Sequence, residues 1–421
     1  MIFSIPYGRE KLYAGFDFPT CEILTPKTPE TPEAGAEELI AQAMDNPIGS
    51  SCLRELARGK ENAVIIISDH TRPVPSKQIL PPMLRQLREG SLDIQITLLV
   101  ATGCHRETSA AELTAKLGEE IFRREQIVVH NCDDTENMVC LGTLPSGAKL
   151  RINRLAAETQ LLISEGFIEP HFFAGFSGGR KSVLPGICSR ETVMSNHCAD
   201  LIDHPCSCAG VLEQNPIHGD MEAAAQMANL KFIVNVLLGE NKQVFHAVAG
   251  DPIAAHHEGC RIMGSLANVH PERPGDVVII SNGGAPLDQN IYQVVKSLAT
   301  ADAAAAEGAD IVVCAACSDG IGGEQFYRAM KECASPSALL EQIRKIPAEE
   351  TVPDQWQYQI LCRILEKHRV LFVTNPGLKT VIEDMKMTYC ATLTEAVEMA
   401  LAAHPDGHTV IIPDGVGAMC V

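Results

Sequence analysis

Residues 63–101 have the sequence AVIIISDHTRPVPSKQILPPMLRQLREGSLDIQITLLVA, and this stretch decides the fold class. An apolar run at 63–68 is followed by a segment of helical periodicity at 76–89 and by a second apolar run at 94–101. Apolar runs of strand length that alternate with helical segments are typical of parallel sheets covered by helices. The stretch therefore predicts an α/β protein.

The same alternation continues on both sides of this stretch. Upstream we expect a hairpin over 1–8 and 11–17 and helices at 35–45 and 50–58. Downstream the pattern predicts a hairpin across 138–152, strands at 126–130, 160–164, 231–238 and 243–248, and helices at 109–117, 190–199 and 216–228.

A domain boundary is expected at residues 270–274, HPERP, because two prolines fall within five residues. The chain is thus predicted to form two α/β domains with largely parallel, Rossmann-like sheets and the active site between them. We expect one domain over 1–270 and a second over 275–405, with 406–421 returning to the first. The second domain should contain strands at 276–281, 310–315, 369–374 and 409–412, and helices at 288–305, 337–345, 354–368 and 393–403.

The amino-acid composition limits which class of protein the chain can belong to. Of 421 residues, 46% are hydrophobic and 21% are charged, so the chain can bury a large aliphatic core. The formal net charge of −19 repels phosphate backbones and anionic lipid, so we expect neither nucleic acid nor membrane as a partner. The N-terminus lacks a secretory pattern, which favours the cytoplasm. Sixteen cysteines are then expected to be buried hydrophobes, with Cys314 and Cys317, or Cys206 and Cys208, as alternative metal or redox pairs.

Two polar motifs directly follow apolar runs, where parallel α/β sheets place their ligands. Asp69-His-Thr-Arg72 follows the run at 63–68, and Arg72 can offer a planar fork to a carboxylate or a phosphate. Ala-Thr-Gly-Cys-His105 ends the run at 94–101, so His105 is a candidate acid or base. The alternative interpretations are an ordinary Asp–Arg loop and a solvated histidine.

A third motif, residues 166–186, is the glycine-rich stretch GFIEPHFFAGFSGGRKSVLPG. Successive glycines allow backbone N–H groups to surround an anion, and Arg180 and Lys181 add positive charge, so the motif predicts phosphate binding. Residues 175–182 nearly match a nucleotide-binding P-loop, but Arg180 replaces the second glycine and Pro185-Gly186 stops the helix that should follow. His197 follows sixteen residues after Lys181.

A fourth motif lies in the second predicted domain. The run at 276–280 leads into Ser281-Asn-Gly-Gly-Ala-Pro286, and the next helix carries Gln293 and Lys296 one turn apart. This pair could hold a carboxylate, or it could be a solvated helix face.

In their order and spacing, the four motifs together resemble the lactate racemase family that uses a nickel-pincer nucleotide. The resemblance extends over nearly the whole chain and also includes Pro170-His171, Asn196-His197, Tyr292-Gln293-x-x-Lys296 and Gln355-Trp356. It implies a racemase or epimerase of small 2-hydroxy acids that transfers hydride to and from a covalently attached nickel-pincer nucleotide. That group is a pyridinium-3,5-dithiocarboxylic-type mononucleotide carrying nickel, and cofactor-synthesis enzymes would load it.

The resemblance also implies roles for individual residues. Lys181 would carry the covalent link and His197 would bind nickel, with Ser177, Gly178, Gly179 and Arg180 completing the cofactor site. His105 and His171 would be paired acid and base, beside Asp69, whose role stays undefined. Substrate would meet Arg72, Gln293, Lys296, Tyr292, Phe173 and Trp356.

The substrate and the reaction leave alternatives open. Hydride transfer suits a 2-hydroxy acid, because removing the α-hydrogen as a proton would place a carbanion beside a carboxylate. An apolar lining from Phe173, Tyr292 and Trp356 favours lactate, while malate and sugar acids are alternatives. A non-catalytic nickel-nucleotide-binding protein would need Lys181 and His197 only. A phosphotransferase that uses the near P-loop is the least favoured hypothesis.

Overall fold

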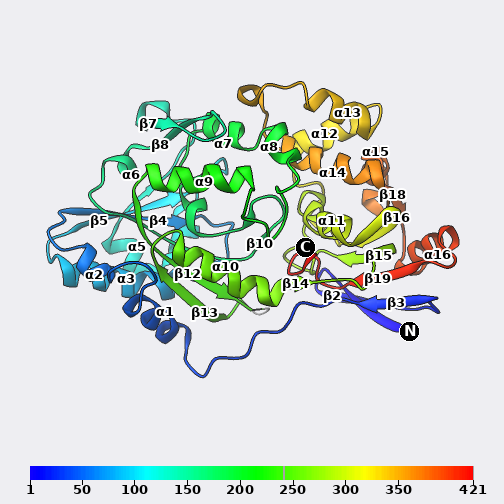
Figure 1. Ribbon diagram of the computed structural model, residues 1–421, viewed down its shortest axis with the longest axis horizontal. Helices are drawn as coiled ribbons and strands as arrows, with labels where there is room; N and C mark the ends of the chain where they lie inside the picture. The colour runs from blue at the N-terminus through cyan, green and yellow to red at the C-terminus, as the bar shows by residue number, and fades with distance from the viewer. Residues whose placement is uncertain (240–241, 421) are drawn as a thin grey trace.

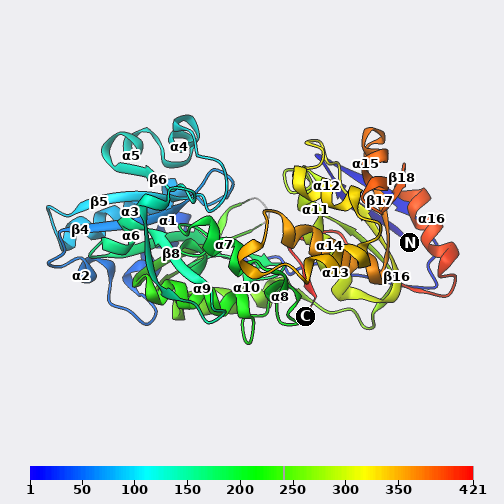
Figure 2. The same ribbon diagram turned by 90° about the horizontal axis from the view of Figure 1, so that it is seen from above.

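A computed structural model describes residues 1–239 and 242–420 of the chain. Two six-stranded sheets form two lobes side by side (Figures 1 and 2). The first sheet has the strand order β13-β12-β9-β4-β5-β6, and the second has the order β18-β17-β16-β15-β19-β3. Among the described residues, no helix has the length and apolar character needed to cross a membrane.

The first sheet is built on β4 (Asn62–Ser68) and β5 (Gln95–Ala101), the two runs of the opening stretch, with α3 (Ser76–Gly90) between them. Val64 and Ile66 enter one apolar cluster, while Ile65 and Ile67 enter another on the opposite face. A strand buried on both faces needs a continuous apolar run, as the sequence has here. All pairings in this sheet are parallel except that of β12 with β13.

The remaining elements of this lobe follow in chain order. They are α1 (Ala36–Asp45), α2 (Leu53–Leu56), α4 (Ala110–Leu117), α5 (Glu119–Arg124), β6 (Gln126–Val129), β7 (Met138–Thr143), β8 (Lys149–Asn153), α6 (Arg154–Glu158), β9 (Leu162–Phe167), β10 (Pro170–His171), β11 (Gly175–Phe176), α7 (Arg190–Asn196), α8 (Ala199–Asp203), α9 (Pro216–Met227), β12 (Leu230–Leu238), β13 (Val244–Gly250), α10 (Ala254–Ala267) and β14 (Asn268–Val269).

The second lobe is entirely parallel in its sheet. Its elements are β15 (Gly275–Ser281), α11 (Ile291–Ala304), β16 (Ala305–Cys314), α12 (Glu324–Glu332), α13 (Pro336–Ile343), α14 (Gln355–Lys367), β17 (Arg369–Val373), α15 (Lys379–Asp384), β18 (Thr388–Cys390), α16 (Leu393–Ala403), β19 (His408–Ile412) and β20 (Met419–Cys420).

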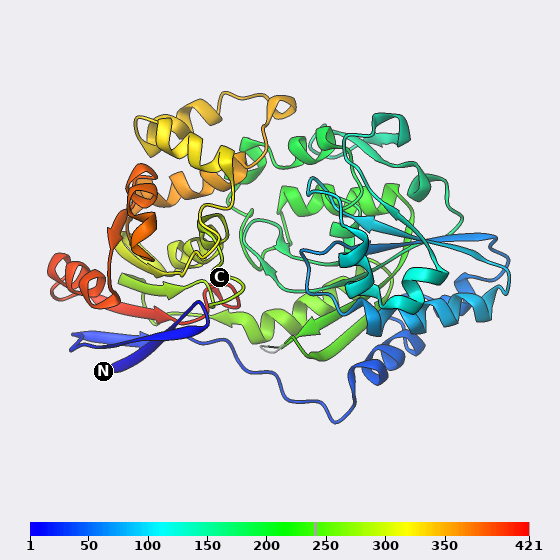
Figure 3. The ribbon, with the colours of Figure 1, turned by 180° about the vertical axis from the view of Figure 1, so that it is seen from behind.

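The N-terminal strands lie on the second lobe, whereas the expected domain limits placed them in the first domain. The hairpin of β1 (Ile2–Tyr7) and β2 (Glu10–Gly15) packs on the second lobe, and β3 (Thr20–Ile23) pairs with β19 (Figure 3). The expectation that residues 1–270 form one unit is therefore wrong for the first strands. The reason is that Phe3 and Ile5 of the hairpin bury themselves in the apolar cluster of β15.

The expected return of 406–421 to the first domain also needs correction. β19 lies inside the second sheet, because its apolar run at 410–412 is buried on both sides there. Only β20 reaches the first lobe, where it pairs with β14, and Val421 lies outside the described residues. We propose the units 25–269 and 1–24 plus 270–420. All sixteen cysteines are free thiols, including Cys314 and Cys317, which are buried.

Candidate active site

Three neighbouring strands of the first sheet deliver their motifs to one edge. β9, β4 and β5 are adjacent and parallel, so their carboxyl ends meet. Asp69 follows β4, His105 follows β5, and His171 follows β9. The strand order therefore brings these three motifs to one edge of the sheet.

A buried carboxylate, Asp69, holds the exposed side chain of His105 at this edge. The Nδ1 atom of His105 lies 2.7 Å from Oδ2 of Asp69, which is 1% exposed. The other carboxylate oxygen accepts hydrogen bonds from the backbone and the hydroxyl of Thr71. Burial alone would raise the pKa of Asp69, but the hydrogen bonds and the charges of His105 and Arg72 lower it to about 2. Asp69 is therefore an anion that holds the Nδ1–H of His105 and leaves Nε2 with a free electron pair.

His171 is held by a small turn between β10 and β11. Its Nδ1 accepts a hydrogen bond of 3.3 Å from the backbone N–H of Ala174, and its ring lies edge-on to Phe173 with 4.5 Å between centroids. Burial and the surrounding cationic side chains lower the pKa of His171 well below its usual value. In the neutral ring, Nε2 then carries the proton, which is the opposite arrangement to His105.

The glycine-rich loop carries Lys181 into the same region. Gly178 has φ +77°, and a Cβ there would lie 2.7 Å from the carbonyl oxygen of Phe167 and from Oδ1 of Asn235. Asn235 on β12 also accepts a hydrogen bond from the N–H of Gly179. The glycines thus let the loop pack closely against the sheet. Burial together with neighbouring cations lowers the pKa of the Lys181 amine well below its usual value.

Arg180 was expected in the cofactor site but does not line this cavity, although its charge helps to lower the pKa of Lys181. Its guanidinium is 1% exposed and points to the opposite side of the loop. It donates to the backbone carbonyls of Ala174 and Phe176 and to Nδ1 of His218. The guanidinium is therefore bonded within the protein, and Arg180 is absent from the residues that line the cavity.

His197 lies at the end of α7, with its ring between two aromatic side chains. The ring centroids are 5.1 Å from Phe173 and 5.0 Å from Trp356, which belongs to α14 of the second lobe. His197 is 5% exposed, and its Nδ1 has no hydrogen-bond partner among the described residues. A buried imidazole nitrogen without a partner is costly unless a ligand satisfies it.

The second lobe contributes the start of α11. The side chain of Asn290 caps this helix by accepting a hydrogen bond of 3.0 Å from the N–H of Gln293. Tyr292, Gln293 and Lys296 then face the first lobe. Burial lowers the pKa of Lys296 to about 8, while the charge of Glu169 opposes that shift.

One cavity of about 360 Å³ joins these groups from both lobes. Arg72 and Lys296 give it a cationic side chain from each lobe, which suits a small anion. Of the fifteen site residues expected from the sequence, its lining includes all except Arg180: Asp69, Arg72, His105, His171, Phe173, Ser177, Gly178, Gly179, Lys181, His197, Tyr292, Gln293, Lys296 and Trp356.

Glu165 is a lining residue that the sequence analysis did not single out. It lies on β9, is 3% exposed, and accepts hydrogen bonds from the hydroxyls of Ser68 and Ser76. Burial raises the pKa of its carboxyl. The signal was available in the sequence, because a glutamate inside the apolar run LLISEGF at 161–167 is unusual for a buried strand.

Two family models match the chain. The model for the lactate racemase N-terminal domain matches residues 7–210, and that for the lactate racemase C-terminal domain matches residues 270–420. The chain is 47% identical to the lactate racemase of Thermoanaerobacterium thermosaccharolyticum, over 99% of this chain and 98% of that protein. It is 49% identical to the lactate racemase of Lactiplantibacillus plantarum, over 91% of this chain and 90% of that protein.

Solved structures agree with these sequence matches. The lactate racemase apoprotein of T. thermosaccharolyticum matches with a TM-score of 0.96 and 46% identity, over 100% of this chain and 99% of that chain. A crystal structure of a Thermotoga maritima protein matches with a TM-score of 0.64 and 19% identity, over 93% of this chain and 99% of that chain. The second match shows a shared fold.

Proposed function

The chain belongs to the lactate racemase family, and from this we propose that it interconverts the two enantiomers of lactate. The observation that carries the proposal is the pairing of His105 and His171 in one cavity with cationic side chains from both lobes. A 2-hydroxy acid offers a carboxylate for the cations and a hydroxyl proton for a base.

We propose that the cofactor is the nickel-pincer nucleotide, and two features of the cavity fit it. The amine of Lys181 is poised for a covalent link, since its lowered pKa favours the nucleophilic neutral form. The unpartnered, buried ring of His197 fits a metal ligand, because imidazole nitrogen suits nickel. When bound, this group would supply a reversible acceptor for hydride, which avoids a carbanion beside the carboxylate.

The protein's own residues would orient the substrate and move the hydroxyl proton. Lys296 and Arg72 would hold the carboxylate, and Gln293 would donate a hydrogen bond. His105 would take the hydroxyl proton at Nε2, with Asp69 stabilising the imidazolium that results. His171 lies in the same cavity and would exchange a proton with the other enantiomer, donating from its imidazolium form when it acts as the acid and accepting a proton when it acts as the base.

The apolar side of the cavity supports lactate among the 2-hydroxy acids. Phe173, Tyr292 and Trp356 would surround the substrate's methyl group. A second carboxylate, as in malate, would need a further cation near these rings. We further propose a cytoplasmic enzyme that depends on cofactor-synthesis enzymes for loading.

The function is tested with protein produced together with the cofactor-synthesis enzymes. Pure L-lactate in D₂O should become racemic, and the D-lactate formed should carry no deuterium at the α-carbon. Deuterium incorporation would show proton abstraction instead, and activity on malate or a sugar acid without activity on lactate would contradict the proposed substrate. Chiral chromatography with mass detection measures both results.

The covalent link has its own test. Lys181→Ala should abolish the adduct that intact mass detects on the co-produced protein, whereas the exposed Lys77→Ala should keep it. A full adduct on the Lys181 variant would contradict this assignment.

A further inference from the structure

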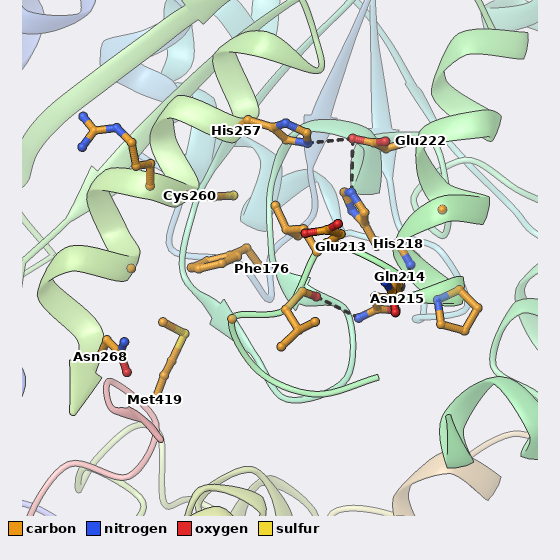
Figure 4. Close-up of a pocket in the computed structure, with 17 residues that line it drawn as sticks. Phe176, Glu213, Gln214, Asn215, His218, Glu222, His257, Cys260, Asn268 and Met419 are labelled. Carbon is orange, nitrogen blue, oxygen red and sulfur yellow. Dashed lines mark hydrogen bonds and ion pairs between the residues drawn. The ribbon is translucent and has the colours of Figure 1, made fainter. Parts of the chain in front are cut away.

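A second, open pocket borders the same glycine-rich loop. Phe176 lines this pocket of about 940 Å³, while Ser177 and Lys181 line the catalytic cavity. Figure 4 shows that the side chains of His218, Glu222 and His257 meet in it, from helices α9 and α10. None of these three residues takes part in the mechanism above.

A continuous series of contacts runs from this pocket to Arg180. Nε of Arg180 donates to Nδ1 of His218 over 3.0 Å. On the other side of the ring, Nε2 of His218 lies 3.2 Å from Oε1 of Glu222. The same oxygen lies 2.9 Å from Nε2 of His257 (Figure 4).

The three side chains in the pocket have the spacing of a metal site, since their ligand atoms all lie within 4.8 Å. The Arg180 contact argues against a bound metal ion. A neutral His218 that accepts a hydrogen bond at Nδ1 must carry its proton on Nε2, which then donates to Glu222. A metal ion would require a free electron pair on that same Nε2. The geometry therefore favours a hydrogen-bonded relay over a metal centre.

Arg180 in turn organises the backbone of the loop. Its terminal nitrogens donate to the carbonyls of Ala174, Phe176, Ser177 and Gly178 over distances of 2.7 to 3.3 Å. Gly175 and Gly178 have φ values of +74° and +77°, which turn these carbonyls to one side. A buried cation also needs a negative partner, and Glu222 is that partner, connected to Arg180 through His218.

We propose that Arg180 is a positioning residue for the loop that presents Lys181, and that Glu222 is its counter-ion through His218. The proposal rests on the proposed function, because the loop matters through the role of Lys181. It makes the second pocket a structural support of the catalytic loop.

The test compares Glu222→Gln and Arg180→Lys with Glu213→Gln, an exposed carboxylate that lines the same pocket. Hydrogen exchange of residues 172–183 is followed by mass spectrometry in the full-length protein, without cofactor. We expect exchange there to be about tenfold faster in Glu222→Gln, and faster still in Arg180→Lys, whose ammonium lacks the guanidinium fork. Glu213→Gln should behave like the wild type.

Exchange of residues 62–68 in β4 is the internal reference, because a general loss of stability would raise exchange there as well. A second readout is the fraction of chains that carry the Lys181 adduct after production with the cofactor-synthesis enzymes. This fraction should fall in both relay variants at unchanged β4 protection.

Two results would overturn the proposal. One is wild-type exchange of the loop in Glu222→Gln. The other is binding of one equivalent of Zn²⁺ by the wild-type protein that His257→Ala abolishes, because the metal would need the nitrogen that the relay protonates. Faster loop exchange without any lactate racemisation by the loaded wild type would contradict the proposed function and still support the relay.

Discussion

At the scale of single residues, the two histidines of the cavity are set in opposite tautomers by different partners. The anionic Asp69 fixes the proton of His105 on Nδ1, whereas the backbone N–H of Ala174 fixes that of His171 on Nε2. The lone pair on Nε2 of His105 is thus free to take a proton, whereas the lone pair of the neutral His171 ring, on Nδ1, accepts from the backbone. A racemase needs both rings, because its two substrates present the hydroxyl differently.

We predict that His105→Ala and His171→Ala each lower turnover roughly 10²-fold or more, the usual loss on removing a general base. Overall rates fall in both directions, since the equilibrium constant of a racemisation is one. The division of labour should appear in the first turnover, where each variant is impaired with the opposite enantiomer. Rapid-mixing absorbance of the loaded protein with each pure enantiomer measures this. Equal impairment with both enantiomers in both variants would contradict the division.

We predict that the titration of Lys296 weakens lactate binding at alkaline pH. Burial lowers the pKa of this amine to about 8, so it is charged below that pH and becomes neutral as the pH rises through it. KM for lactate should therefore rise between about pH 7 and 9, since a neutral amine no longer attracts the carboxylate. Arg stays charged throughout this range, so Lys296→Arg should remove the rise even if its KM is higher at every pH. A KM that is independent of pH in the wild type would refute this assignment.

At the scale of elements, the sequence predicted those that stand on long apolar runs. β4, β5, β9, β15, β16, β17 and β19 all appear where the runs are, and the motifs after them reach the cavity. β3 and β10 were missed, because strands of four and two residues show no periodicity and are defined by their partners. The direction of Arg180 was missed for a related reason: the sequence shows its charge but not the inward-facing carbonyls that attract it.

The glycine-rich loop allows a prediction about stability. Gly178→Ala should destabilise the protein by about 1–3 kcal/mol, because φ is +77° and the new Cβ would meet the carbonyl oxygen of Phe167 at 2.7 Å. Gly219→Ala, in α9 with open space around its Cβ position, should stabilise the protein by about 0.5–1 kcal/mol. Urea unfolding of the two variants measures both values. An equal change in the free energy of unfolding of both variants would show that the backbone angle and close contacts of Gly178 carry no special cost.

At the scale of the whole molecule, the site exists only where the lobes meet. The histidines and Lys181 come from the first lobe, whereas Gln293, Lys296 and Trp356 come from the second. A polar contact centred on Asp203, at the end of α8, joins the two lobes. Its carboxylate lies 2.9 Å from Nε of Arg344 and 2.9 Å from Nε2 of Gln359. Because α8 begins two residues after His197, this contact couples the lobes close to the proposed metal ligand.

We therefore predict that Asp203→Ala raises KM for lactate roughly three- to tenfold, equivalent to about 1 kcal/mol for a partly exposed ion pair. The substitution leaves the apolar clusters intact, including the one that extends through both lobes, so the urea midpoint should change little. Substrate binding suffers, because Lys296 and Gln293 are then held less firmly opposite the two histidines. Steady-state kinetics of the loaded enzyme measure KM, with the exposed Asp406→Ala as the matched control. A wild-type KM in Asp203→Ala would mean that apolar contacts such as Trp356 on His197, whose ring centroids are 5.0 Å apart, hold the lobes in register by themselves.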